Sequence, residues 1–179
     1  MAGRLIAVVG PSGAGKDSLL GALLQARADD LHLAQRMITR PTNAGGEDFV
    51  GLNVAEFQAK KAAGAFVVDW EAHGLFYGIP WAEFTPLDQG KDVIFNGSRQ
   101  HLPKAKALFS ALETVLITAP IPVLAQRLAA RGRETANEIT ARLARAPYDL
   151  PAITPLYQVQ NDQSLDHGLA QLLKLLDGR

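Results

Sequence analysis

The stretch that most constrains the fold is "LIAVVGPSGAGKDSLLGALL", which runs from Leu5 to Leu24. It joins an unbroken apolar run of strand length, a glycine-rich turn and a helix with an apolar face. Gly10 to Lys16 fits G-x-x-x-x-G-K, the pattern of a loop that surrounds phosphate with backbone N–H groups. The positive end of the following helix favours an anion at the same place. The sequence therefore predicts a nucleoside triphosphate site, formed by Gly10, Pro11, Ser12, Gly13, Ala14, Gly15, Lys16, Asp17 and Ser18.

Asp17 departs from this pattern, which has Ser or Thr after the lysine to hold magnesium through its hydroxyl. Ser18 cannot simply take over, because one residue turns a helix by roughly 100°. Two interpretations of Asp17 stay open. It could stabilise the helix N-terminus, or its carboxylate could bind Mg²⁺ directly or through water. We favour the metal role, because the charge would otherwise face phosphates without compensation.

The rest of the chain alternates apolar strand-like runs with helical patterns, which predicts an α/β fold with a parallel sheet flanked by helices. Strands are expected at Leu5–Val9, within "DVIFNGS" and at Thr114–Ala119, and more weakly at "FVVDW". Helices are expected at 16–27, 54–63, 103–112 and 122–130, then from 135 through Leu143, with a last one near the C-terminus. Asn53 with Glu56, and Thr135 with Glu138, are capping-box candidates. Residues 40–52 are expected to form a loop and 64–80 a hairpin.

These patterns predict a single domain over residues 1–179. Its core is expected at 1–35 and 86–179, with a small inserted lobe at about 36–85 and an Arg-rich lid at about 127–146. Lys plus Arg and Asp plus Glu both number 18, so nothing in the charge indicates nucleic acid or a membrane as partner. The absence of cysteine excludes disulfides and thiolate metal sites and fits a reducing compartment. We expect a soluble cytoplasmic monomer or a small oligomer such as a homodimer.

Arginines cluster in the predicted lid, namely Arg127, Arg131, Arg133, Arg142 and Arg145. Phosphoryl transfer depends on positive charge around the moving group rather than on covalent chemistry from the protein. For any single arginine a solvated helix face is the more common explanation. For Arg131 and Arg142 we favour a functional role, on the resemblance given next.

The order of the motifs resembles the guanylate kinase-like group of P-loop kinases along nearly the whole chain. The motifs are "GPSGAGK", "TR" with an early "GGE", "VVDWEAHGLFYGIP", "DVIFNGSRQ", "RLAARGRET" with "EITARLARA", and a late "ND". The resemblance implies a P-loop NTPase fold in which the inserted lobe binds the phosphoryl acceptor, with ATP and Mg²⁺ as cofactors. It also implies catalytic roles for Lys16, Arg131 and Arg142, and places Asn161 where adenine is contacted.

Departures from the family pattern concern the acceptor. The family continues T-R-x-P-R-x-G-E and then a phosphate-binding tyrosine, whereas "TRPTNAGGEDFVG" lacks the second arginine and the tyrosine. Together with Asp17 and "NGSRQHLP", this resembles the subgroup that phosphorylates ribose 1,5-bisphosphate in phosphonate catabolism. The implied reaction moves the γ-phosphoryl group of ATP onto that sugar and gives 5-phosphoribosyl 1-diphosphate. The expected acceptor-binding residues are Arg40, Asp69, Tyr77, Asn96, Ser98 and Arg99.

Two other functions stay open at this stage. One is a guanylate kinase acting on GMP, against which the missing arginine and tyrosine count. The other is a catalytically silent module that binds proteins. Such modules typically lose the loop glycines or lysine, whereas Gly10, Gly15 and Lys16 are present here.

Overall fold

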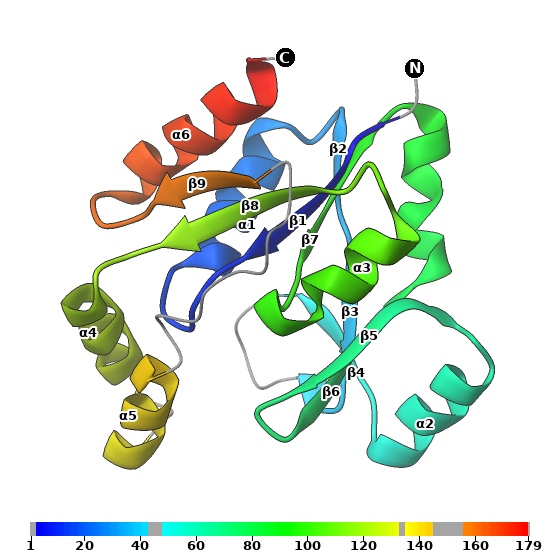
Figure 1. The fold of residues 1–179 in the computed structure, drawn as a ribbon, viewed down its shortest axis with the longest axis horizontal. Coiled ribbons are helices and arrows are strands. Elements are labelled where there is room, and N and C mark those ends of the chain that lie inside the picture. Colours follow the sequence, from blue (N-terminus) through cyan, green and yellow to red (C-terminus); the bar gives the residue numbers. More distant parts are fainter. Residues whose placement is uncertain (1–2, 43–47, 133–134, 145–155, 179) are drawn as a thin grey trace.

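Two β-sheets organise the protein in the computed structural model, which describes residues 3–42, 48–132, 135–144 and 156–178 (Figure 1). The first sheet has five strands in the order β2–β7–β1–β8–β9, and every neighbouring pair is parallel. Its strands are β2 (Leu31–Leu33), β7 (Asp92–Asn96), β1 (Leu5–Val9), β8 (Glu113–Thr118) and β9 (Leu156–Gln160). The predicted parallel sheet flanked by helices is confirmed.

Both faces of the central strand β1 are buried, as its continuous apolar sequence predicts. Ile6 and Val8 pack in one cluster with leucines of α1 (Lys16–Ala26) and α6 (Leu165–Asp177). Leu5, Ala7 and Val9 pack in a second cluster with the 3₁₀ helix η2 (Trp81–Gln89) and α3 (Leu102–Leu108). Helices therefore cover both faces, and β1 delivers the loop at residues 10–15 to the carboxyl edge of the sheet.

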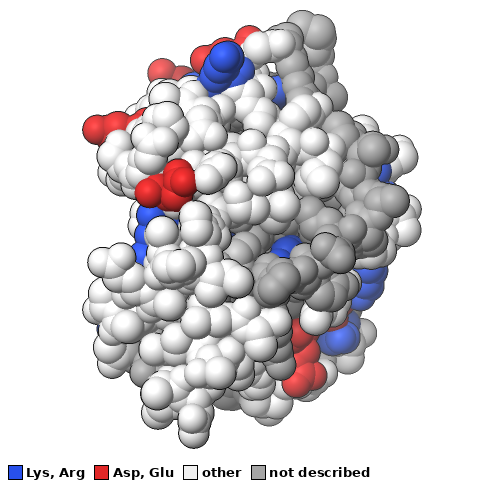
Figure 2. Space-filling view, turned by 60° about the vertical axis from the view of Figure 1, so that its left-hand side comes forward, with Lys and Arg blue, Asp and Glu red and all other residues white. Residues whose placement is uncertain are grey.

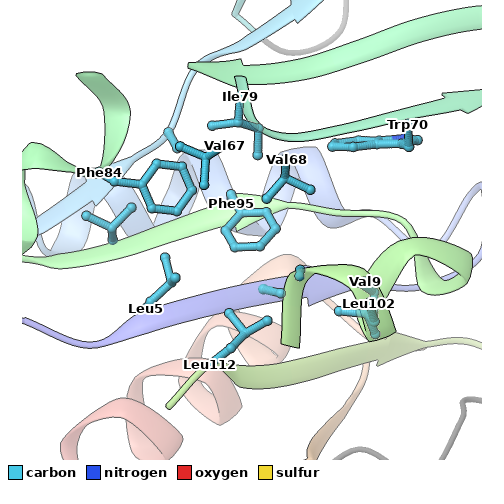
Figure 3. Close-up of a cluster of buried hydrophobic side chains, with 14 residues drawn as sticks. Leu5, Val9, Val67, Val68, Trp70, Ile79, Phe84, Phe95, Leu102 and Leu112 are labelled. Carbon is cyan, nitrogen blue, oxygen red and sulfur yellow. The ribbon is translucent and has the colours of Figure 1, made fainter. Parts of the chain in front are cut away.

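The second sheet has four strands in the order β4–β3–β6–β5. Its strands are β4 (Phe49–Gly51), β3 (Arg36–Ile38), β6 (Leu75–Pro80) and β5 (Phe66–Ala72). Figure 3 shows its Val67, Val68 and Ile79 beside Leu5 and Phe95 of the first sheet, so one apolar cluster joins the two sheets. The helix α2 (Val54–Ala62) covers the outer face, where Phe57 stacks on Phe66 and Phe76.

The predicted hairpin at 64–80 is confirmed as β5 and β6. Its turn consists of His73 and Gly74, both with positive φ, +54° and +73°. Two-residue turns of this hand match the twist of antiparallel strands and fix their register. Trp70 consequently faces Tyr77 across the hairpin, and Asp69 faces Gly78.

Two helices, α4 (Ile121–Arg131) and α5 (Ala136–Ala144), form the segment expected to be a lid and lie at the lower left of Figure 1. Both predicted capping boxes are confirmed. Glu56 N–H donates to Asn53 Oδ1 at 2.8 Å, and Glu138 N–H donates to Thr135 Oγ1 at 3.3 Å. The predicted lid residues Arg133 and Arg145 lie outside the described residues.

Two expectations were wrong. The helix predicted to reach residue 112 ends at Leu108, because Phe109 is extended (φ −127°, ψ 92°) and Lys106 Nζ donates to the carbonyls of Ser110 and Leu112. The loop expected at 40–52 contains β4, which pairs in parallel with β3. The strands β2, β3 and β9 were not predicted at all.

Charged side chains do not gather into one band on the face seen in Figure 2. Small groups of blue and red lie next to each other at the top, the left edge and the lower right of that view, and broad white areas separate these groups. Within the described ranges, no helix combines the length and apolar character needed to cross a membrane.

Candidate active site

A cleft of about 660 Å³ opens where the glycine-rich loop, the carboxyl end of β7, the second sheet and the α4–α5 segment meet. It brings together most of the residues singled out from the sequence. From that set, the lining includes Gly10, Ser12, Gly13, Gly15, Lys16, Asp17, Arg40, Tyr77, Asn96, Ser98, Arg99, Arg131 and Arg142. Residues more than 130 positions apart in the chain therefore share one solvent-accessible space.

Glycines shape the loop at two positions where a side chain could not fit. A Cβ at Gly10 would lie 2.2 Å from the carbonyl oxygen of Ile117. Gly15 has φ +84°, and a Cβ there would lie 2.5 Å from Asn161 Nδ2. The loop can thus turn tightly onto α1, as the phosphate-binding loops that precede a helix N-terminus do.

Lys16 folds back over this loop. Its ammonium donates to the carbonyls of Gly10 at 3.0 Å and Pro11 at 3.1 Å. Burial lowers the pKa of Lys16 from 10.5 to about 8; Asp17 opposes this shift, and Arg36, Arg99 and Arg131 add to it. Several positive charges are therefore concentrated around the lysine, an arrangement that an incoming phosphate would relieve.

Asp17 lies in the cleft beside Asn96. The side-chain amide of Asn96, at the end of β7, donates to Asp17 Oδ1 at 2.7 Å. This bond orients the Asp17 carboxylate within the cleft. Among the described residues no three His, Asp or Glu side chains cluster as a metal site. Magnesium in phosphoryl-transfer sites takes one or two carboxylates together with waters and substrate phosphates, and the Asp17 carboxylate fits the first of these ligand types.

The arginines of the α4–α5 segment separate into two groups. Arg142 Nη1 donates to Ser12 Oγ at 3.2 Å, so α5 touches the glycine-rich loop directly, and Arg131 also lines the cleft. Arg127 instead donates to the backbone carbonyl of Asn161 at 2.8 Å and does not line the cleft.

Five predicted site residues do not line the cleft, namely Pro11, Ala14, Ser18, Asp69 and Asn161; Pro11 and Ala14 are buried within the loop itself. Asp69 is not in the cleft lining, and its carboxylate accepts from Lys61 and Lys104. Asp69 points to the strand face opposite Trp70 and Tyr77, where its bonds to the two lysines hold it. Asn161 is buried, and its amide donates to the Ala14 carbonyl at 2.7 Å, so it supports the loop. Ser18 is exposed on α1.

Arg36 and Trp70 line the cleft without having been predicted as site residues. Arg36 is the first residue of β3 and only 8% exposed. No motif marks this arginine in the sequence. Its one distinguishing feature is a charged side chain in a short strand that also contains the buried Ile38.

A strand, a glycine-rich loop and a helix at the edge of a parallel sheet, with a cationic cleft above them, define a P-loop phosphotransferase. The guanylate kinase family model matches residues 2–178. The chain therefore belongs to the guanylate kinase family, whose kinases in general use ATP and Mg²⁺.

Relatives and a solved structure agree with this assignment. The ribose 1,5-bisphosphate phosphokinase PhnN of Pantoea vagans (strain C9-1) is 46% identical over 175 residues, which are 97% of each chain. The bifunctional ribose 1,5-bisphosphokinase-thymidine phosphorylase of Cupriavidus necator is 41% identical over 97% of this chain, which spans only 29% of that protein's length. The guanylate kinase of Anaplasma phagocytophilum matches with a TM-score of 0.70 at 17% identity, covering 99% of this chain and 86% of the other, and indicates the fold alone.

Proposed function

We propose that this protein transfers the γ-phosphoryl group of ATP to ribose 1,5-bisphosphate and produces 5-phosphoribosyl 1-diphosphate. The observation that carries the proposal is the charge of the cleft. Its described lining holds six cationic side chains, Lys16, Arg36, Arg40, Arg99, Arg131 and Arg142. The acidic groups of that lining are Asp17 and Glu71. Such an excess suits a triphosphate together with an acceptor that carries two phosphates and no base. The names of the full-length relatives support the same substrate.

The division of labour follows from the position of each group. Backbone N–H groups of the glycine-rich loop and the ammonium of Lys16 would hold the triphosphate. Asp17, oriented by Asn96, would hold Mg²⁺, which neutralises phosphate charge during transfer. Arg131 and Arg142 would stabilise the moving phosphoryl group, with α4 and α5 acting as the lid.

The second sheet would act as the acceptor lobe. Arg40 and Tyr77 would bind the accepting phosphate, with Ser98 and Arg99 on the facing edge of the first sheet. The acceptor is a phosphate oxygen that is already ionised at neutral pH, so the reaction needs no general base.

One assay distinguishes this function from its alternatives. The purified protein, with ATP and Mg²⁺, is given ribose 1,5-bisphosphate, GMP or no acceptor, and ADP release is followed. We expect release with the sugar and a diphosphate ester in the ³¹P spectrum of the product. Release with GMP alone would replace the proposal by guanylate kinase activity, and silence with every acceptor would favour a binding module.

A further inference from the structure

Arg36 is a buried guanidinium in the wall of the cleft. It is 8% exposed and begins β3, the strand that follows β2 of the first sheet by only two residues. Withdrawing a guanidinium from water is costly unless its charge meets favourable partners. Its position in a ligand-sized cleft makes a bound anion one such partner.

The surroundings of Arg36 fix its guanidinium in place before any ligand binds. Nη1 donates to the backbone carbonyl of Asn96 at 3.1 Å. Cζ lies 5.2 Å from the ring centroid of Tyr77 and 5.9 Å from that of Trp70, within the range of cation–π attraction. Those two rings are stacked with centroids 5.3 Å apart and planes 2° apart. Figure 3 shows Trp70 at the edge of the apolar cluster that joins the two sheets.

A guanidinium has five N–H donors in a planar fork, so it can hold the Asn96 carbonyl and bind phosphate oxygens as well. The purine of a nucleotide offers this position only neutral acceptors, whereas a phosphate offers two negative charges. The environment of Arg36 therefore favours a second phosphate over a base.

The other cations of the cleft have different assignments. Lys16, Arg131 and Arg142 gather at the glycine-rich loop, and Arg142 contacts Ser12 there. Arg40 lies beyond the end of β3 and matches a position that binds the accepting phosphate. Arg36 is close enough to lower the pKa of Lys16 through its charge, yet it is anchored to β7 and to the aromatic pair of the second sheet.

We propose that Arg36 binds the phosphate of the acceptor that is not itself phosphorylated, the 5-phosphate of ribose 1,5-bisphosphate, and so makes the cleft selective for a sugar with two phosphates. This inference rests on the proposed function. It assigns a specificity-determining contact to a residue that no sequence motif marks.

The test combines removal of the side chain with removal of the phosphate that it binds. Arg36→Met and Arg36→Lys are compared with the unchanged protein by titration calorimetry, at saturating Mg²⁺ and a non-hydrolysable ATP analogue. The titrants are ribose 1,5-bisphosphate, ribose 1-phosphate and ribose 5-phosphate. Arg27→Met is the matched control, because Arg27 pairs with Asp30 and Asp177 and does not line the cleft.

Arg36→Met should weaken binding of the bisphosphate and of ribose 5-phosphate by roughly 10- to 150-fold, the range of a charged hydrogen bond. Binding of ribose 1-phosphate should change by less than about threefold, the level expected for a site that it does not reach. The affinities of Arg36→Lys should lie between those of Arg36→Met and the unchanged protein, because lysine keeps the positive charge and lacks the planar fork of N–H donors. Arg27→Met should leave all three affinities unchanged.

Two results would overturn the inference while leaving the proposed function intact. One is that Arg36→Met loses as much affinity for ribose 1-phosphate as for the bisphosphate. The other is that Arg36→Met loses no affinity for any of the three sugars. An unchanged far-ultraviolet circular dichroism spectrum verifies that each variant is folded. Failure of the unchanged protein to bind the bisphosphate would instead refute the proposed function.

Discussion

Raising the pH from 7 to 9 should increase the number of protons that the protein takes up when the nucleotide binds. We expect Lys16 to be the group that takes up the additional proton. The pKa of this lysine is lowered to about 8, chiefly by burial and further by the arginines around it. At pH 7 about nine-tenths of the Lys16 side chains carry a proton before binding, and at pH 9 only about one-tenth do. A triphosphate beside the ammonium favours the charged form. Binding at pH 9 should therefore take up close to one proton at Lys16.

The sign and size of the effect on affinity follow from linkage. Between the free pKa of about 8 and the higher pKa in the complex, the complex binds more protons than the free protein. Affinity for the nucleotide is then flat below pH 8 and falls as the pH rises above it. Each full pH unit beyond that point costs about 1.4 kcal/mol, so the dissociation constant should be about tenfold larger at pH 9 than at pH 7.

Calorimetry in two buffers with different ionisation enthalpies measures the proton uptake directly. A non-hydrolysable ATP analogue with Mg²⁺ is titrated at pH 7 and pH 9 into the unchanged protein and into Lys16→Met. Phosphate groups with a second pKa of about 6 are already ionised at pH 9 and add nothing to the difference. Proton uptake at pH 9 that persists in Lys16→Met, or no uptake in either protein, would refute the assignment to Lys16.

Two further changes test the metal site and the fold separately. Asp17→Asn should raise the Mg²⁺ concentration needed for half-maximal nucleotide affinity. Asp17→Ser should raise this concentration less. If Asp17→Asn left the Mg²⁺ dependence unchanged, the carboxylate would be excluded as a ligand. Asn53→Ala removes the capping bond to Glu56 and should lower the free energy of unfolding by about 1 kcal/mol in urea denaturation. Because α2 lies on the outer face of the second sheet, nucleotide affinity should not change, and a changed affinity would contradict that separation.

Elements with a strong local signal could be predicted from the sequence. The apolar run of β1, the glycine-rich turn and the two capping boxes each depend on residues that are neighbours in the chain. The missed strands have no such signal. β9 exposes Leu156, Gln158 and Gln160, and β2, β3 and β4 have three residues each. Their pairing depends on strands far away in sequence.

The candidate site likewise contains features that depend on neighbouring residues and features that depend on residues far apart in the chain. The loop at residues 10–16 could be predicted because its function and its local conformation need the same residues. Asp69 and Tyr77 were assigned to one site by motif, yet the two-residue turn places them on opposite faces of the hairpin. Trp70 takes the cleft face instead. A register difference of one residue is invisible in motif spacing and decides which side chain meets the ligand.

Asn96 links the two halves of the proposed site through different groups. Its side-chain amide holds Asp17 on the nucleotide side, and its backbone carbonyl holds Arg36 on the acceptor side. Replacing its side chain removes only the first of these bonds, because the carbonyl stays with the backbone of β7. The proposed metal position and the proposed position of the second phosphate can therefore be perturbed independently, even though both are anchored at a single residue. That geometry explains why a buried residue at the end of β7 has a polar side chain directly after three apolar residues.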